Sequence, residues 1–174
     1  MTTQVNGDTG VSQVQPSVVT QADLAAGVAG TGPAFEAYAS ADQTVTSGVS
    51  TKMVLNTKSF DLTNAYNTST HRFNPQVAGY YQVNVRSRGV ASTTLNSSWV
   101  EILKNGAVLT RAAEMVGPTT YTFGGSALVY LNGTTDYLEF ACVVNGTGTI
   151  YQAVTGSSIG AYGPRVSAFL ARAV

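Results

Sequence analysis

Polar and apolar residues alternate along residues 79–88, in the sequence GYYQVNVRSR. Tyr81, Val83 and Val85 fall on one side of an extended segment, and the polar residues between them fall on the other. This period of two is typical of a strand with one buried face and one solvent face. The segment therefore predicts an antiparallel sheet that packs on one side only.

Further strand patterns follow one another along the chain at intervals of about ten residues. The segment 98–112 divides at Asn105-Gly106, a pair typical of a two-residue β-hairpin because both residues readily adopt positive φ. Short strands separated by such turn signals are typical of an all-β sandwich or barrel. The other strand-like segments are 34–40, 50–62, 119–133, 135–148 and 165–174.

The first 32 residues differ from the rest of the chain and contain one short helix pattern. Thr20 is the predicted N-cap and Asp23 lies three residues later, as in a capping box. A helix of eight or nine residues is unstable alone in water, so this segment needs a partner surface. We expect residues 1–32 to form an attachment arm that binds its partner through Val18, Val19 and Leu24. The alternative is that these residues form an unstructured tail. We expect residues 33–174 to form the head domain.

Several of the expected strands are apolar on both faces. The segments SALVYL (126–131) and WVEIL (99–103) cannot bury all their side chains in one sandwich core. Contiguous exposed apolar surface is uncommon on monomers, so we expect a neighbouring subunit to cover it. The side chains predicted for this interface are Tyr81, Val83, Trp99, Val129, Tyr130, Phe140 and Phe169.

Composition narrows the function classes. Charged residues make up 10% of the 174 residues and the formal net charge is zero, so we expect neither a nucleic-acid partner nor a membrane surface. No apolar run approaches the roughly 18 residues that a membrane-spanning helix needs. The single cysteine, Cys142, excludes an internal disulfide, and its apolar surroundings predict a buried, inert thiol.

Candidate chemistry is sparse. His71 is the only histidine, and the chain has no G-x-S-x-G motif to accompany it in a catalytic triad. The carboxylates of Asp61, Asp136 and Glu139 lie near expected turns and strand ends, where we expect them to be solvated or to cap turns. We therefore predict that the protein is not an enzyme and that it binds no cofactor and no metal ion.

Aromatic residues near glycine-rich segments indicate a possible recognition surface. Tyr151 and Tyr162 flank a Gly/Ser-rich stretch that we expect to be an outer loop. A receptor- or glycan-binding module would use this stretch, within 145–164, together with the loops around 88–97 and 116–125.

An ordered series of segments resembles the globular head of the complement one-q family, a branch of the tumour-necrosis-factor-like jelly rolls. The resemblance covers residues 33–174. It is carried by PAFEAY, VLNTKSFD, FNP, GYYQVNV, ILKNG, ALVYLNGTTDYLEF and SAFLA. The turn LNGTTDY is longer than the family's Gly-Asp turn, and no collagen-like repeat precedes the head.

This resemblance implies a jelly roll of about ten strands that forms homotrimers. An arm followed by such a head looks like bacteriophage virion proteins, which implies a head fibre, capsid decoration or fibre tip, localised to the virion and assembled in the host cytoplasm. Its partners would be a capsid or tail protein and, for a fibre tip, a host glycan or receptor. The alternatives are a receptor- or glycan-binding module of a tail fibre and a bacterial spore or cell-surface head.

Overall fold

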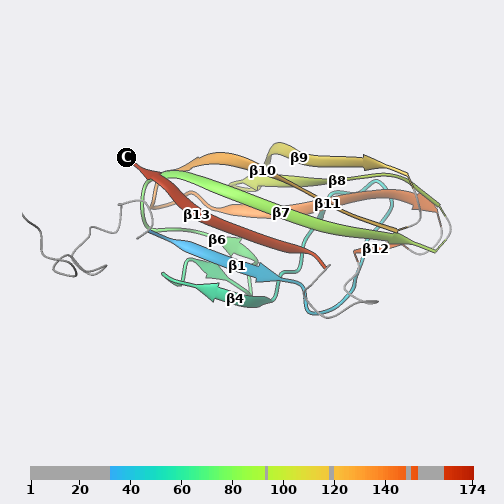
Figure 1. Cartoon of the computed structure of the whole chain (residues 1–174), viewed down its shortest axis with the longest axis horizontal. Coiled ribbons are helices and arrows are strands. Elements are labelled where there is room, and N and C mark those ends of the chain that lie inside the picture. The colour runs from blue at the N-terminus through green and yellow to red at the C-terminus, as the bar shows by residue number, and fades with distance from the viewer. Residues whose placement is uncertain (1–31, 93, 118–119, 148–149, 153–162) are drawn as a thin grey trace, which may run out of the picture.

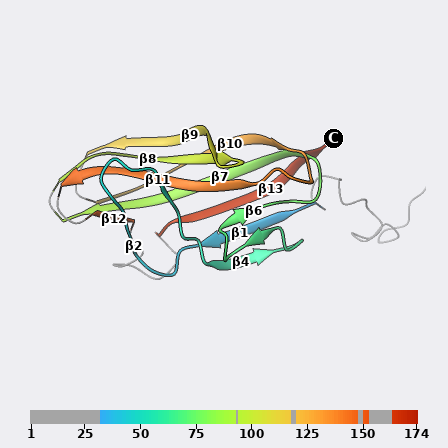
Figure 2. The same cartoon turned by 180° about the vertical axis from the view of Figure 1, so that it is seen from behind.

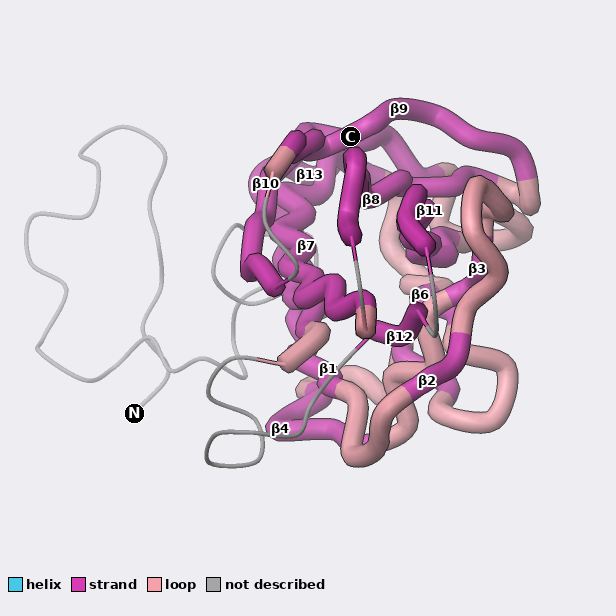
Figure 3. The backbone as a smooth tube through the Cα atoms, turned by 90° about the vertical axis from the view of Figure 1, so that its right-hand side faces the viewer, coloured by secondary structure: helices cyan, strands magenta, loops and turns pink. Residues whose placement is uncertain are grey.

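Two antiparallel sheets pack face to face in the structure, a computed structural model that describes residues 32–92, 94–117, 120–147, 150–152 and 163–174 (Figure 1). Figure 3 looks along the strands, with β10, β7, β1 and β4 forming one layer and β9, β8 and β11 lying in the other. The prediction of an all-β jelly-roll sandwich is confirmed. The described residues form thirteen strands, whereas about ten were predicted. Five of the thirteen are only two or three residues long.

The first sheet has the order β10–β7–β13–β1–β4. Strands β12 and β2 extend this sheet beside the far end of β7, beyond the end of β13. The strands are β1 (Ala34–Tyr38), β2 (Gln43–Thr44), β4 (Thr57–Asp61), β7 (Gly79–Ala91), β10 (Thr120–Leu131), β12 (Ile150–Gln152) and β13 (Arg165–Ala173).

The second sheet has the order β9–β8–β11–β6–β5, and β3 pairs with β11 beyond the end of β6. Its strands are β3 (Thr51–Lys52), β5 (Tyr66–Asn67), β6 (Arg72–Phe73), β8 (Thr94–Lys104), β9 (Ala107–Val116) and β11 (Leu138–Thr147). Seen from behind, β8 and β11 lie across β7 (Figure 2). The strand β12 lies within the stretch 145–164 that we expected to be a loop, so that expectation is wrong for residues 150–152.

Local sequence accounts for the central strands and the hairpin. Burial alternates along the whole of β7, as its period of two predicts, with Tyr81, Val83 and Val85 buried. Asn105 and Gly106 join β8 to β9 with φ values of 54° and 81°, the left-handed geometry that a type I′ turn requires. At Gly125 the backbone of β10 approaches the carbonyl of Ala112 on β9 so closely that a Cβ would collide with it.

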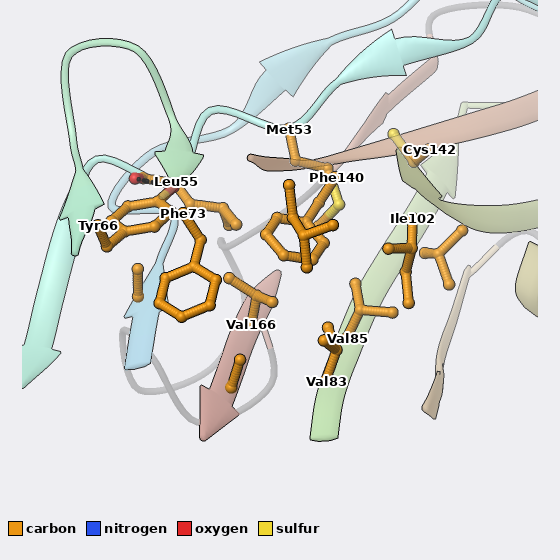
Figure 4. Packing of buried hydrophobic residues seen from close by; sticks show 14 of the residues in the cluster. Met53, Leu55, Tyr66, Phe73, Val83, Val85, Ile102, Phe140, Cys142 and Val166 are labelled. Carbon is orange, nitrogen blue, oxygen red and sulfur yellow. Dashed lines mark hydrogen bonds between the residues drawn. The ribbon is translucent and has the colours of Figure 1, made fainter. Parts of the chain in front are cut away.

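Four aromatic rings pack together at one end of the core, where they connect the two sheets. Phe35 of β1 stacks on Tyr66 and Phe73 of the second sheet, with ring centroids 4.6 Å and 4.5 Å apart. Phe73 in turn meets the edge of the Tyr81 ring at 5.5 Å. The hydroxyl of Tyr66 donates to the carbonyl of Leu55 at 3.0 Å, so its polar atom is satisfied. Figure 4 shows this packing continuing through Phe140 and Ile102 towards Cys142.

Replacing Leu55 with alanine tests the core. Leu55 has no exposed surface, so Leu55→Ala is expected to lower the free energy of unfolding by about 2–5 kcal/mol. Leu62→Ala removes the same atoms from a side chain that is 70% exposed and is expected to change stability by at most about 0.5 kcal/mol. Urea unfolding at a fixed protein concentration measures both, and equal effects would contradict this packing.

Candidate interaction surface

Four large side chains lie exposed on the outer face of the first sheet and form the surface that we call the outer patch: Tyr80, Leu128, Tyr130 and Phe169. They are between 41% and 60% exposed. They come from the three neighbouring strands β7, β10 and β13, whose alternation turns these positions away from the core.

Strand register brings the four side chains of the outer patch close together. Tyr130 lies opposite Tyr80, with ring centroids 5.6 Å apart, and Gln82 lies between Leu128 and Phe169. A shallow hollow of about 330 Å³ opens beside Tyr80 and Leu128. The patch therefore combines aromatic rings with a depression large enough to accept a side chain.

The structure corrects part of the predicted subunit interface. Tyr81, Val83, Val129 and Phe140 are at most 3% exposed and lie in the core of the single chain. They point inward between the two sheets of the same subunit, Phe140 from the second sheet and the other three from the first, so they offer no surface to a neighbour. On β7 and β10 the exposed apolar side chains are found at alternate positions instead, as at Tyr80, Leu128 and Tyr130.

The other predicted interface residues lie on the surface but on two different sheets. Tyr130 and Phe169 belong to the outer patch, and their role in an interface stays a prediction. Trp99 lies on β8 of the second sheet, where the Arg111 guanidinium covers its ring at 4.1 Å. Its indole nitrogen donates to Glu101 at 2.8 Å, so Trp99 is already packed within its own chain.

The predicted interface did not include Leu128, the most exposed side chain of the outer patch. The signal was present, because Leu128 alternates with the buried Val129 and lies two residues from Tyr130. The arm residues Val18, Val19 and Leu24, the expected short helix, and Tyr162 lie outside the described residues. Tyr151 lies in β12, but its side chain is not among those described.

Buried carboxylates on the outer face of the second sheet are paired within the chain. Glu139 is 7% exposed and accepts hydrogen bonds from Lys52 at 2.6 Å and Arg72 at 2.9 Å. Burial alone raises the pKa of Glu139, but the bonds from Lys52 and Arg72 outweigh it and leave the pKa below its ordinary value. The carboxylate is therefore a structural ion-pair partner.

Asp136 fixes the long turn between β10 and β11. Its carboxylate accepts hydrogen bonds from the Asn132 backbone amide at 3.0 Å and from the Asn105 side chain at 2.7 Å. Lys104 lies 2.8 Å from the same carboxylate. Burial raises the pKa of Asp136, and these donors lower it further than burial raises it. The longer turn is thus held by its own side chains.

The candidate reactive groups lie apart. His71 occupies the β5–β6 turn, with Nδ1 3.4 Å from the carbonyl oxygen of Leu55. Cys142 is buried, as predicted, and burial raises the pKa of its thiol to about 12, so the nucleophilic thiolate is suppressed at neutral pH. Within the described residues, no three histidine, cysteine or acidic side chains gather closely enough to hold a metal ion. No helix in the same residues is long and apolar enough to cross a membrane.

The chain has the complement one-q/tumour-necrosis-factor-like jelly-roll fold. It is similar to the globular domain of zebrafish complement 1qA protein, at 14% identity and a TM-score of 0.55, over 82% of this chain and 99% of that one. It is also similar to murine APRIL, at 7% identity and a TM-score of 0.53, over 79% and 98% of the two chains. At these identities the similarity establishes the fold alone. No protein-family model and no curated protein matches the sequence.

The pairing of Glu139 predicts acid sensitivity. Because its pKa is lower in the folded state, the stabilisation is present above the unfolded value of 4.5 and is lost as the pH falls through the folded value. Glu139→Gln is expected to lower stability at pH 7 by about 1–2 kcal/mol and to reduce the loss between pH 7 and pH 3.

Urea unfolding at the two pH values measures this, and Glu114→Gln is the matched control because Glu114 is exposed. An unchanged pH dependence in Glu139→Gln would show that Glu139 does not carry the effect.

Proposed function

We propose that this protein is a non-catalytic structural head that assembles as a homotrimer through the outer patch. The single observation that carries the proposal is the exposure of Tyr80, Leu128, Tyr130 and Phe169 side by side on the outer face of the first sheet. Monomers rarely leave such a contiguous apolar surface in water.

The composition of the three patch strands supports burial against another protein. Strands β7, β10 and β13 contain four arginines but no lysine, aspartate or glutamate. Arginine and aromatic residues are enriched in the buried centres of interfaces, whereas lysine and the acids are depleted. Because burial contributes about 25 cal/mol per Å² of apolar surface, covering these four side chains would contribute several kcal/mol to each subunit contact.

A non-catalytic role is supported by how the described reactive groups are used. Glu101 accepts hydrogen bonds from Trp99 and Ser50, and Glu139 is held by two cations. Cys142 is buried with a raised thiol pKa. These groups stabilise the fold, and none of them has a neighbour that would activate it.

The particular role that we propose is that of a bacteriophage virion protein, as a head fibre, capsid decoration or fibre tip. The support comes from the order of segments, because residues 1–32, for which we predict an attachment arm, precede the jelly-roll head. The arm would bind a capsid or tail protein and the trimeric head would project from it. A bacterial spore or cell-surface head is the alternative for the same architecture.

Charge substitutions in the outer patch test the trimer. The wild-type protein is expected to have three times the 18.1 kDa mass of one chain in solution. The double variant Leu128→Glu/Phe169→Glu is expected to be monomeric, because each buried unpaired charge costs about 2–5 kcal/mol at an interface. Sedimentation equilibrium measures both masses.

Leu62→Glu is the matched control, since Leu62 is exposed but lies outside the outer patch, and it is expected to stay trimeric. A monomeric wild type, or a trimeric double variant, would contradict the proposed interface.

Removal of residues 1–32 tests the arm. The truncated chain is expected to remain trimeric but to lose co-sedimentation with purified virions of the phage that encodes it, whereas the full chain binds. Quantitative mass spectrometry of the sedimented particles measures both. Full retention of the truncated chain would place attachment in the head, and recovery of the native protein in cell envelopes instead of virions would favour the bacterial alternative.

A further inference from the structure

A polar hollow of about 460 Å³ lies at the end of the sandwich where the connections around β5 and β6 meet the β10–β11 turn. Four threonines and four amide side chains line it, together with Arg72, Tyr137 and a single apolar residue, Ala65. Small-molecule sites are commonly between about 300 and 1,000 Å³, so this hollow is large enough to hold a ligand.

The walls of the hollow are held in place by hydrogen bonds within the chain. The Oδ1 atom of Asn67 accepts from the backbone amides of Ser69 and Thr70, at 2.8 Å and 3.0 Å. The side chain of Asn74 donates to the carbonyl of Asp136 at 2.7 Å and so ties the two walls together. A site that is ordered before binding loses less entropy when a ligand enters.

The lining of the hollow carries only one charged side chain. Arg72 is the one charged residue in the lining, and its Nε atom donates to Glu139 at 2.9 Å. No carboxylate lines the hollow. An anion would therefore meet a single cation whose partner Glu139 is shared with Lys52, and a metal ion would find only neutral oxygen ligands. The lining favours a neutral ligand rich in hydroxyl groups.

An aromatic ring and an adjoining depression extend the hollow. Tyr137 contributes its ring, against which the Arg72 guanidinium lies at 4.1 Å from the centroid. A second hollow of about 290 Å³ adjoins the first and shares Asn64 and Asn67 with it, and we call the two adjoining hollows the groove. Lys58 also lines the second hollow, where its Nζ atom lies 3.1 Å from the Asp61 carboxylate. Such a groove suits a short chain of sugar rings. An extended peptide would find no apolar pocket there for its side chains.

We propose that this groove binds a neutral oligosaccharide. Hydroxyl groups of the sugar exchange hydrogen bonds with the threonine hydroxyls and the amide groups, which both donate and accept. The apolar C–H face of a sugar ring packs beside Tyr137. The site lies within one subunit, so this proposal does not depend on the proposed trimer or on the proposed virion role.

Ligand-observed saturation-transfer NMR on the full chain tests the proposal. The probes are maltotriose, cellotriose and N-acetylchitotriose as neutral oligosaccharides, with a heparin disaccharide and inorganic phosphate as anions. At least one neutral probe is expected to bind. Thr70→Val/Thr134→Val removes two lining hydroxyls with little change of shape and is expected to weaken that binding about tenfold, because each lost hydrogen bond costs a factor of about three.

Two further variants separate a local effect from unfolding. Thr94→Val changes an exposed threonine of β8, outside the groove, and is expected to bind like wild type. Thr134→Trp fills the groove from an exposed position and is expected to abolish binding with an unchanged melting temperature. If none of the neutral probes binds, if Thr70→Val/Thr134→Val binds as wild type does, or if only the anions bind, the proposal is overturned.

Discussion

The packing of Phe35 between Tyr66 and Phe73 is the contact on which the arrangement of the two sheets depends. Phe35 lies on β1 in the first sheet, and the rings that it meets lie on β5 and β6 in the second, so the stack fixes how the layers face one another. Once β1 presents Phe35 inward, the pairing of β1 with β13 and of β13 with β7 determines which side of each strand is buried. The positions on the opposite side of each strand are therefore the exposed ones, and they include the outer patch.

The outer faces of the two sheets differ in how far their large side chains are covered by the same chain. On the second sheet, Arg111 covers Trp99, and Glu101 and Glu139 are both hydrogen-bonded to neighbouring side chains. On that sheet the largest side chain, Trp99, and the two glutamates are packed or bonded within one chain, although Val108 of β9 is 54% exposed. On the first sheet, Leu128 and Phe169 stay about half exposed or more, with no comparable cover from their own chain. This asymmetry is why the subunit contact is assigned to the first sheet.

The sequence was sufficient for the longer strands, the β8–β9 hairpin and the burial of Cys142, because period-two patterns and Asn-Gly turns are local signals. It was insufficient for choosing the interface. The pattern places Tyr81 on one face with Val83 and Val85, and only the position of the second sheet shows that this face is covered by the same chain and not by a neighbour. The polar groove was missed because Asn67 of β5 and Thr134 of the β10–β11 turn lie far apart in the sequence, and their proximity depends on the tertiary fold. Strand β12 has no pattern of its own, since its three residues are held by pairing with β2 and β7.

Assembly through the outer patch would strengthen ligand binding at the groove, because both features occur on one molecule. The groove depends on Arg72 and Glu139, which lie in the same chain, so each subunit builds a complete site without help from a neighbour. A groove lined by neutral hydroxyl and amide groups binds weakly, because each hydrogen bond made to a ligand replaces one made to water. A trimer would present three such sites at a fixed spacing, and linked sites raise the overall affinity for a repetitive surface by about 10²–10⁴ without any new contact. Self-association through the first sheet would thus give a weak sugar site a useful strength, which joins the structural and the recognition roles in one assembly.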